Sequence, residues 1–259
     1  MRAISLIAFS ILLSPIASPL NAQGFDGGVT ETLQSIYIPT VVRAPFSAVV
    51  HTEWIREIPG GGTYTVVNQR RVARDGSGRI YEERWELVPK DSGIESRMNV
   101  VQIADPNQHT LYNCFVFERR CVLLKFADAA ITVYEPTIVS TGPLANNKGF
   151  NTHLDLGLRS ISGMDAHGTR ETTTLLPGTM GNDRPYVTTR EYWNSPQIGV
   201  NLLSIVEGPR IGKQTFTLSD LSLSEPDPAL FQLPQGYQVL DRRRQVPPQP
   251  GHSPDEDRR

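Results

Sequence analysis

Apolar and polar residues alternate with a period of two over most of the chain. Between residues 160 and 237, runs rich in Thr, Val, Ile, Tyr and Trp are separated by turns made of Pro, Gly, Asn and Asp. A period of two is typical of β-strands that bury one face, and short strands divided by such turns favour antiparallel neighbours. This stretch is therefore predicted to form an antiparallel meander, and the rest of the chain is predicted to add strands to the same sheet.

The N-terminal part of the chain continues the pattern with three long strands. They are predicted over residues 45–58, 63–74 and 79–87. Three glycines at 60–62 provide the first turn, and Asp-Gly-Ser-Gly at 75–78 provides the second, which is a strong hairpin signal. Three long strands in succession indicate a large, twisted sheet.

One irregularity in the last strand of the meander predicts a β-bulge. Phe216 and Leu218 share one parity, whereas Leu221 and Leu223 share the other. A bulge near residues 219–220 would keep all four side chains on the buried face, because one extra residue restores the alternation.

The start of the chain predicts export. Met1 and Arg2 precede an apolar run over residues 3–13, and a small residue, Ala22, offers a cleavage point. A basic start, a short apolar core and a small residue at the cut are typical of a secretory signal peptide, here predicted as residues 1–22. The apolar run is shorter than the roughly 20 residues that span a bilayer.

The remainder is predicted to be one β-rich domain over residues 23–240. A short helix is predicted at 30–37, and the unpatterned segment 136–151 is predicted to be a long surface loop that carries a sheet crossover or is mobile. Residues 241–259 contain almost no apolar side chain, so a disordered tail is predicted there. The expected fold is thus mainly β, with a single curved antiparallel sheet and one or a few short helices.

Charge and hydropathy narrow the possible partners. The chain has 25 basic and 27 acidic residues. A nucleic-acid partner would require a basic surplus on one face, and none is found. No second long apolar segment follows the start, so no transmembrane segment is expected after removal of the signal peptide. The expected location is the periplasm or the medium.

The two cysteines, Cys114 and Cys121, predict a disulfide. An even, closely spaced pair in an oxidising compartment is most simply a structural bridge. The flanking segments are strand-like, so the two residues would face each other across a hairpin with its turn at 117–118. A redox pair or a pair of metal ligands is the alternative, but this spacing matches neither a thioredoxin-type motif nor an obvious metal site.

Aromatic residues are spread over several predicted strands and suggest a binding surface. If the sheet curls without closing, its concave face would present them as an apolar trough for a lipid or a peptide. The aromatic residues predicted to bind a ligand are Trp54, Tyr64, Tyr81, Trp85 and Trp193. The alternative is that they form the core beneath the helix.

Catalytic signatures are missing from the sequence. The pairs His51/Glu53 and His153/Asp155 would each point to one side of a strand, but a metal site needs at least three converging ligands. His167 lies near Arg170 and Glu171 without forming a triad, and no nucleophile elbow or phosphate-binding loop occurs. No catalytic residue, metal or cofactor is predicted, and a hydrolase or metal enzyme is the less favoured hypothesis.

Several short motifs resemble a family of exported bacterial proteins of unassigned function. The resemblance covers most of the mature chain and is most specific in its last third. Its residues are Gly163, Ala166, Gly168, Thr169 and Arg170; Gly181 and Asn182; Glu191, Trp193, Ser195 and Pro196; and the closing run 225–237. The segments PFSAVVHTEW and RVARDGSGRIYEE also look like that family.

More distantly, the arrangement resembles the LolA-like and RseB-like fold, a curved, incompletely closed antiparallel sheet (an open half-barrel) wrapped over helical segments. This likeness implies a non-enzymatic periplasmic binding protein that holds an acyl chain, another apolar ligand or a lipidated envelope partner on the sheet. The alternative is an RseB-like module that senses or binds envelope proteins. One clear predicted helix and a disulfide hairpin depart from that fold.

Overall fold

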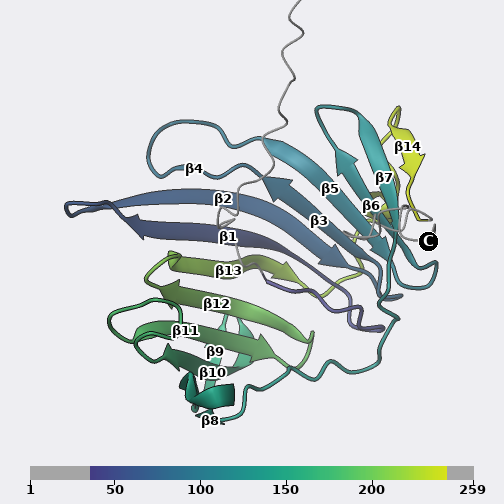
Figure 1. Cartoon of the computed structure of the whole chain (residues 1–259). Coiled ribbons are helices and arrows are strands. Elements are labelled where there is room, and N and C mark those ends of the chain that lie inside the picture. Colours follow the sequence, from purple (N-terminus) through teal and green to yellow (C-terminus); the bar gives the residue numbers. More distant parts are fainter. Residues whose placement is uncertain (1–35, 244–259) are drawn as a thin grey trace, which may run out of the picture. The chain divides into compact units, whose positions relative to one another are not determined.

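A computed structural model describes residues 36–243 (Figure 1). The predicted signal peptide lies outside the described residues, as do most of the predicted helix at 30–37 and the predicted tail beyond Arg243.

The described residues form one 14-stranded sheet. Its strands are β1 Phe46–Glu57, β2 Thr63–Arg74, β3 Ile80–Trp85, β4 Val88–Pro89, β5 Met98–Asp105, β6 Thr110–Phe115, β7 Arg120–Lys125, β8 Gly142–Pro143, β9 Gly149–Ile161, β10 Met164–Leu175, β11 Tyr186–Ser195, β12 Val200–Gly208, β13 Gly212–Ser222 and β14 Gln238–Asp241. The order is β14-β7-β6-β5-β3-β2-β1-β13-β12-β11-β10-β9-β8, and β4 pairs with β2 off this path.

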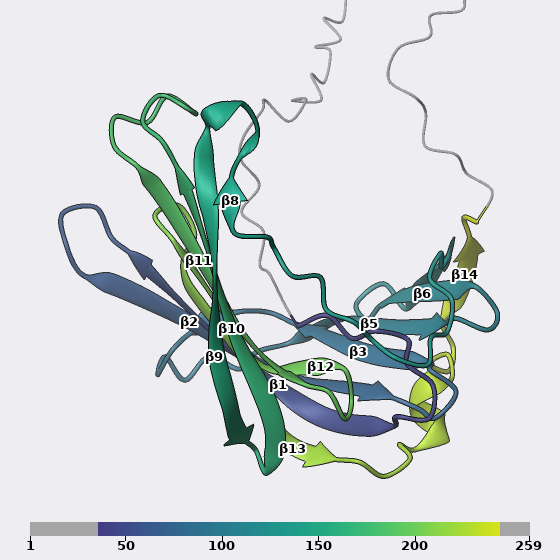
Figure 2. The ribbon, with the colours of Figure 1, turned by 90° about the horizontal axis from the view of Figure 1, so that it is seen from below.

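This sheet confirms the predicted fold class. It is curved, does not close and is antiparallel except where β14 pairs with β7 (Figures 1 and 2). The helices in the described part are two 3₁₀ turns, η1 Ala145–Asn147 and η2 Pro228–Phe231. Two meanders, β1 to β7 and β8 to β13, are joined by the antiparallel pairing of β1 with β13. The pairing of β13 with β1 goes beyond the predicted pairing of chain neighbours.

Turn chemistry places the hairpins where the sequence predicted them. The glycines at 60–62 all have positive φ, and they connect β1 to β2. In the next turn the buried carboxylate of Asp75 accepts hydrogen bonds from the backbone N–H groups of Ser77 and Arg79 at 3.0 and 2.8 Å. The turn of the disulfide hairpin also falls between β6 and β7 as predicted.

The predicted bulge in β13 is present. Val49 pairs with Ser219 and Ser47 with Ser222, so β13 carries one more residue than β1 over this interval. Asp220 takes the left-handed conformation there, with φ of 49°. The bulge brings Leu221 against the core, but Leu223 remains 42% exposed. The prediction that all four apolar residues are buried is therefore wrong for Leu223, which follows the last residue of the strand.

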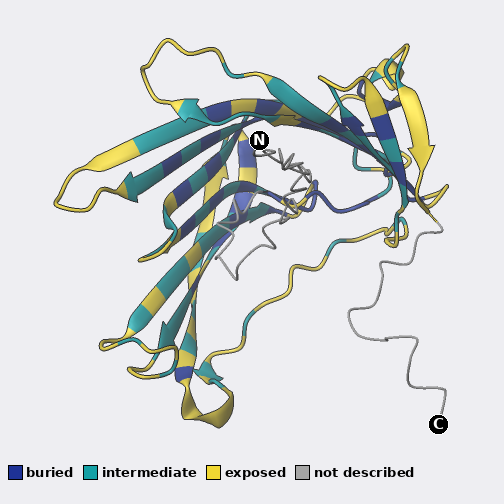
Figure 3. Cartoon of the chain, turned by 45° about the horizontal axis from the view of Figure 1, so that its top comes forward, coloured by how far each residue is buried: buried dark blue, intermediate teal, exposed yellow. Residues whose placement is uncertain are grey.

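Alternation divides the central sheet into two faces, each with its own apolar cluster. The Phe46 face contains the larger cluster, which includes Val50, Phe216 and Leu218, all fully buried (Figure 3). The opposite face, here called the Tyr81 face, contains a smaller cluster around Tyr81, the two cysteines and Phe231. Apolar side chains are thus buried on both faces of the sheet, but the smaller cluster covers only the part around β3, β5, β6 and β7.

The segment 126–141 carries the chain from β7, next to the edge strand β14, to β8 at the opposite edge of the sheet (Figure 2). It is tied down by a parallel bridge between Ile131 and Val41, and by the backbone N–H of Val139, which donates to Glu171 at 3.1 Å. A crossover was predicted within 136–151, whereas the observed crossover begins earlier and spans residues 126–141. The predicted loop 136–151 is wrong in its second half, where β8, η1 and the start of β9 lie.

The closing motif of the sequence fastens the C-terminal segment onto the Tyr81 face. The carboxylate of Glu225 accepts from the backbone N–H of Gly76 at 3.0 Å, and Asp227 caps η2. Phe231 enters the smaller cluster beneath the guanidinium of Arg79, which lies 4.8 Å from its ring centroid. These motif residues therefore have structural roles.

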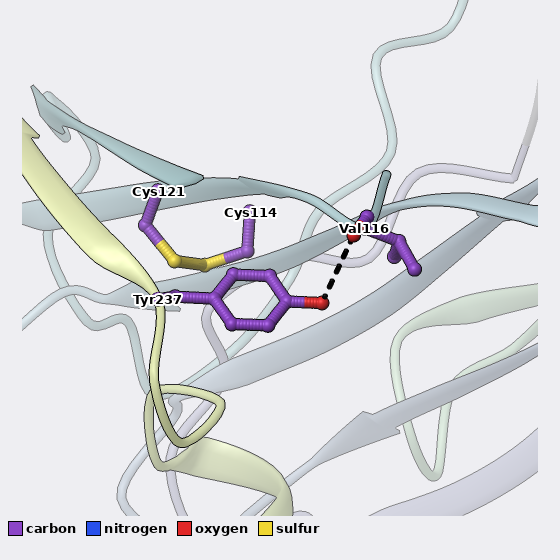
Figure 4. Close-up of a disulfide and its surroundings, with 4 residues drawn as sticks. All are labelled: Cys114, Val116, Cys121 and Tyr237. Carbon is purple, nitrogen blue, oxygen red and sulfur yellow. Dashed lines mark hydrogen bonds between the residues drawn. A yellow bond between two sulfur atoms is a disulfide. The ribbon is translucent and has the colours of Figure 1, made fainter. Parts of the chain in front are cut away.

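The disulfide between Cys114 and Cys121 is confirmed. The two residues are directly paired across β6 and β7, and both are fully buried. Figure 4 shows the ring of Tyr237 beside the bridge, with its hydroxyl donating to the carbonyl of Val116 at 3.5 Å. The bridge thus forms part of the surface on which the C-terminal segment packs.

Candidate ligand-binding site

The five aromatic residues predicted to bind a ligand lie in different places. Trp54 is buried on the Phe46 face, where its indole N–H donates to the carbonyl of Ile211 at 2.5 Å. Tyr64 lies on the same face but is 42% exposed near the end of β2. Trp193 belongs to the larger cluster, with Arg159 3.9 Å from its ring centroid. The structure does not bring these three together with the other two.

Tyr81 and Trp85 lie on the opposite face and share one partner. The carboxylate of Glu83, between them in β3, accepts from the Tyr81 hydroxyl at 2.9 Å and from the Trp85 indole N–H at 2.8 Å. Tyr81 is buried, whereas Trp85 is half-buried and lines a groove. Trp85 is therefore the predicted aromatic residue that meets a substantial concave surface.

That groove has a volume of about 800 Å³ and lies over β13, β1 and β2. Its other wall is Trp85 and the connection 86–97, which folds back so that β4 pairs with β2 at Val66 and Val67. The volume lies within the range of about 300–1,000 Å³ usual for ligand pockets. Four apolar side chains line it, namely Val49, Val67, Trp85 and Val88.

The groove forms because β2 and β3 pair over only three residues. Their register covers Val72 to Arg74, and β4 joins β2 again only at Val67. Between these two paired intervals, hydrogen bonds that involve side chains take the place of pairing between β2 and a neighbouring strand. The backbone N–H of Arg71 donates to Glu83 at 3.1 Å, and the side-chain amide of Asn68 donates to the carbonyl of Trp85 at 2.8 Å. The interval of β2 that β3 leaves unpaired becomes part of the groove.

Glu83 is the electrostatic centre of this region. Its side chain is 3% exposed and faces the guanidinium of Arg71 at 2.9 Å. Burial alone would raise the pKa of Glu83, but hydrogen bonds from Arg71, Trp85 and Tyr81 outweigh it, so the pKa lies below its usual range. Burial and the nearby Glu83 charge raise the pKa of the Tyr81 hydroxyl. The carboxylate is ionised and its four hydrogen bonds fix the groove wall.

Other polar groups of the groove come from β1 and the connection 86–97. Lys90 donates to Glu53 at 2.8 Å, and this pairing raises the pKa of Lys90. The Nε2 atom of His51 lies 2.6 Å from the hydroxyl of Ser219. His51 and Glu53 thus have different partners, Ser219 and Lys90.

Asp155, from the second predicted pair His153/Asp155, forms a separate, exposed cluster with His167. Asp155 lies 2.9 Å from Nε2 of His167, and a hydrogen bond from the backbone N–H of Gly157 lowers the pKa of Asp155, with His167 adding to the effect. The cluster lies on β9 and β10, and β11, β12 and β13 separate it from β1 in the sheet. No group of three or more His, Cys, Asp or Glu side chains suited to a metal ion occurs among residues 36–243.

Two features of the site were missed in the sequence. The sequence predicts no element over residues 89–96, and nothing in the composition of this segment predicts that it folds back on β2. Glu83 lies two residues from both Tyr81 and Trp85, so the period of two already placed it on their face. A carboxylate placed between two aromatic residues on the same face of a strand was the feature of the sequence that could have predicted the shared hydrogen bonds of Glu83.

Comparison with solved structures shows similarity of fold. An uncharacterized conserved protein from Thermus thermophilus matches at 10% identity over 77% of this chain and 91% of that chain, with a TM-score of 0.40. MucB in the MucA/MucB complex of Pseudomonas aeruginosa matches at 14% identity over 80% and 62%, with a TM-score of 0.37. A LolA superfamily protein from Nitrosomonas europaea matches at 11% identity over 73% and 90%, with a TM-score of 0.28.

These similarities agree with the distant LolA-like and RseB-like resemblance of the sequence, and they concern the fold alone. No protein-family model and no curated protein matches the chain. Within the described residues, no helix has the length and apolar character needed to cross a membrane.

Proposed function

We propose that this chain is a non-enzymatic, exported binding protein of the LolA-like type, whose curved sheet holds an amphipathic ligand with an apolar chain. The single observation behind the proposal is the groove of about 800 Å³ formed by β13, β1, β2 and the connection 86–97. A free lipid or the acyl chain of a lipidated envelope partner has the matching chemistry. The export signal predicted in the sequence supports a periplasmic or secreted location.

The chemistry of the groove supports holding rather than turnover. Val49, Val67, Val88 and the indole of Trp85 offer apolar contact, and burying apolar surface contributes about 25 cal/mol per Å². The charged groups of the floor are engaged with one another, as in the pairs Lys90–Glu53 and Arg71–Glu83. A passive groove with a firm hydrogen-bonded wall follows from this arrangement.

Two experiments test the proposal: direct detection of a bound ligand, and measurement of binding by a variant whose groove is filled. The mature protein, purified from an envelope fraction, is expected to retain a lipid that native mass spectrometry detects. Val67→Trp places a large side chain in the groove and should reduce binding of an added acyl probe at least ten-fold. Val187→Trp on β11, at a position 40% exposed and outside the groove, is the matched control and should bind normally.

Thermal melting of both variants checks that they are folded. A wild-type protein that carries no lipid and binds no acyl probe would contradict the proposal. So would a folded Val67→Trp variant that binds the probe as well as the wild type does.

A further inference from the structure

The charged pairs of the groove differ in how far each partner is exposed. The guanidinium side chain of Arg71 is 65% exposed, whereas its partner Glu83 is 3% exposed. The side chain of Lys90 is 50% exposed and that of Glu53 38%. In the first pair the carboxylate is buried, so Arg71 is the member that a ligand meets. In the second pair both side chains are accessible, and Lys90 is the more exposed of the two.

A buried carboxylate holds its cation in place without removing the cation's capacity to donate further. A guanidinium has five N–H groups and an ammonium has three. Glu83 takes only part of the Arg71 capacity, through Nε at 2.9 Å and a second nitrogen, and Glu53 takes one donor of Lys90. The remaining donors are available to an anion, with little side-chain entropy left to lose.

Two accessible acidic groups oppose this arrangement, namely Glu53, which is already paired with Lys90, and Asp91. Asp91 lines the groove, is exposed and follows Lys90 in the chain. Its charge favours the protonated form of Lys90, but it would also weaken the attraction for an anion. Removing Asp91 should therefore strengthen anion binding, whereas removing Arg71 and Lys90 should weaken it.

We propose that the ligand of this groove is an anionic amphiphile, whose carboxylate or phosphate head lies between Arg71 and Lys90 and whose chain covers Val67, Val88 and Trp85. This inference rests on the proposed function and specifies the class of ligand. Charge complementarity carries it, because the more exposed member of each ion pair is cationic. Arginine and lysine are also the side chains that recognise carboxylate and phosphate heads most strongly.

The experiment compares three probes of equal chain length on the mature protein: laurate, dodecyl phosphate and dodecanol. Binding is followed by titration calorimetry and by the fluorescence change that Trp85→Phe abolishes. The wild type is expected to bind both anionic probes at least ten-fold more tightly than dodecanol, because one charge-assisted hydrogen bond contributes on the order of a ten-fold change. The laurate and phosphate arms identify which head is preferred.

Three variants sharpen the comparison. The double variant Arg71→Gln with Lys90→Gln should lose the preference for anionic probes and keep its dodecanol affinity within about two-fold. Asp91→Asn should bind the anionic probes more tightly. The charge-matched control is Arg184→Gln, in an exposed turn outside the groove, and it should behave as the wild type does.

Equal affinity for laurate and dodecanol in the wild type would overturn the inference. If Val67→Trp then abolished the binding of both laurate and dodecanol, the proposed function would stand without the inference about an anionic head. Failure of every probe to bind would instead remove the proposed function and the inference together.

Discussion

Substitution of Glu83 by glutamine tests the account of the groove wall most severely. Each carboxylate oxygen accepts two donors. Oε1 accepts from Arg71 Nε and the Tyr81 hydroxyl, both at 2.9 Å. Oε2 accepts from the Arg71 backbone N–H at 3.1 Å and the Trp85 indole N–H at 2.8 Å. A glutamine amide has only one oxygen, so two donors lose their acceptor whichever way it is oriented.

The expected loss of unfolding free energy follows from that count. A hydrogen bond to a charged group contributes about 1.5–3 kcal/mol, so two lost bonds in a buried site give about 3–6 kcal/mol at pH 7. Urea unfolding followed by far-ultraviolet circular dichroism measures this loss. Glu57→Gln at the exposed end of β1 is the control, with an expected change within about 0.5 kcal/mol.

The pH dependence adds a second, independent check. The pKa of Glu83 is lowered in the folded state, so its contribution is fully present above the unfolded value of about 4.3. It is lost as the pH falls through the lower, folded pKa. The stability difference between wild type and Glu83→Gln should therefore shrink as the pH falls below about 4. A loss under about 1 kcal/mol at pH 7, or a difference that stays constant on acidification, would refute the reasoning.

Three further substitutions test the packing. Gly168→Ala should cost about 1–3 kcal/mol, measured by urea unfolding, because the added Cβ would lie 2.6 Å from the Trp193 ring. Cys114→Ser with Cys121→Ser should cost about 2.5 kcal/mol by the chain-entropy relation for a short loop, measured in the same assay. Glu225→Ala should cost about 1 kcal/mol and speed limited proteolysis of the C-terminal segment, since the carboxylate no longer holds the turn after β2.

Their controls and contrary outcomes are equally direct. The control for Gly168→Ala is Gly208→Ala, because a Cβ at position 208 would lie 3.2 Å from its nearest neighbour, the hydroxyl oxygen of Thr188. Gly208→Ala should lose less unfolding free energy than Gly168→Ala. A larger loss for Gly208→Ala would count against the packing described for Trp193. If the oxidised wild type were no more stable than the variant with both cysteines replaced by serine, the disulfide would not stabilise the folded protein. Unchanged cleavage in Glu225→Ala would show that the rest of the segment holds it.

The strands, their turns and the disulfide could be predicted because each depends on residues near one another in sequence. The glycines at 60–62 and the Asp75 turn fix local backbone geometry, and Cys114 faces Cys121 within one hairpin. The bulge at Asp220 could also be predicted, because a change of parity within one strand leaves few alternatives.

The groove could not be predicted, because it depends on pairings that parity does not specify. Alternation places a side chain on one of two faces, but it does not say which strand lies alongside. The pairing of β13 with β1 and the return of β4 onto β2 are therefore invisible in the sequence. The aromatic residues were grouped by type, whereas Trp54 and Trp85 lie on opposite faces of the sheet.

The seam between β1 and β13 has a consequence for the order of assembly. His51 and Ser219, which touch across it, are 168 positions apart in the chain. A hairpin forms in about 1–10 μs because its two strands are neighbours in the chain, whereas the seam has to close a loop of this length first. The two meanders can therefore form before they join, and closure of the seam is expected to set the rate at which the centre of the sheet is completed.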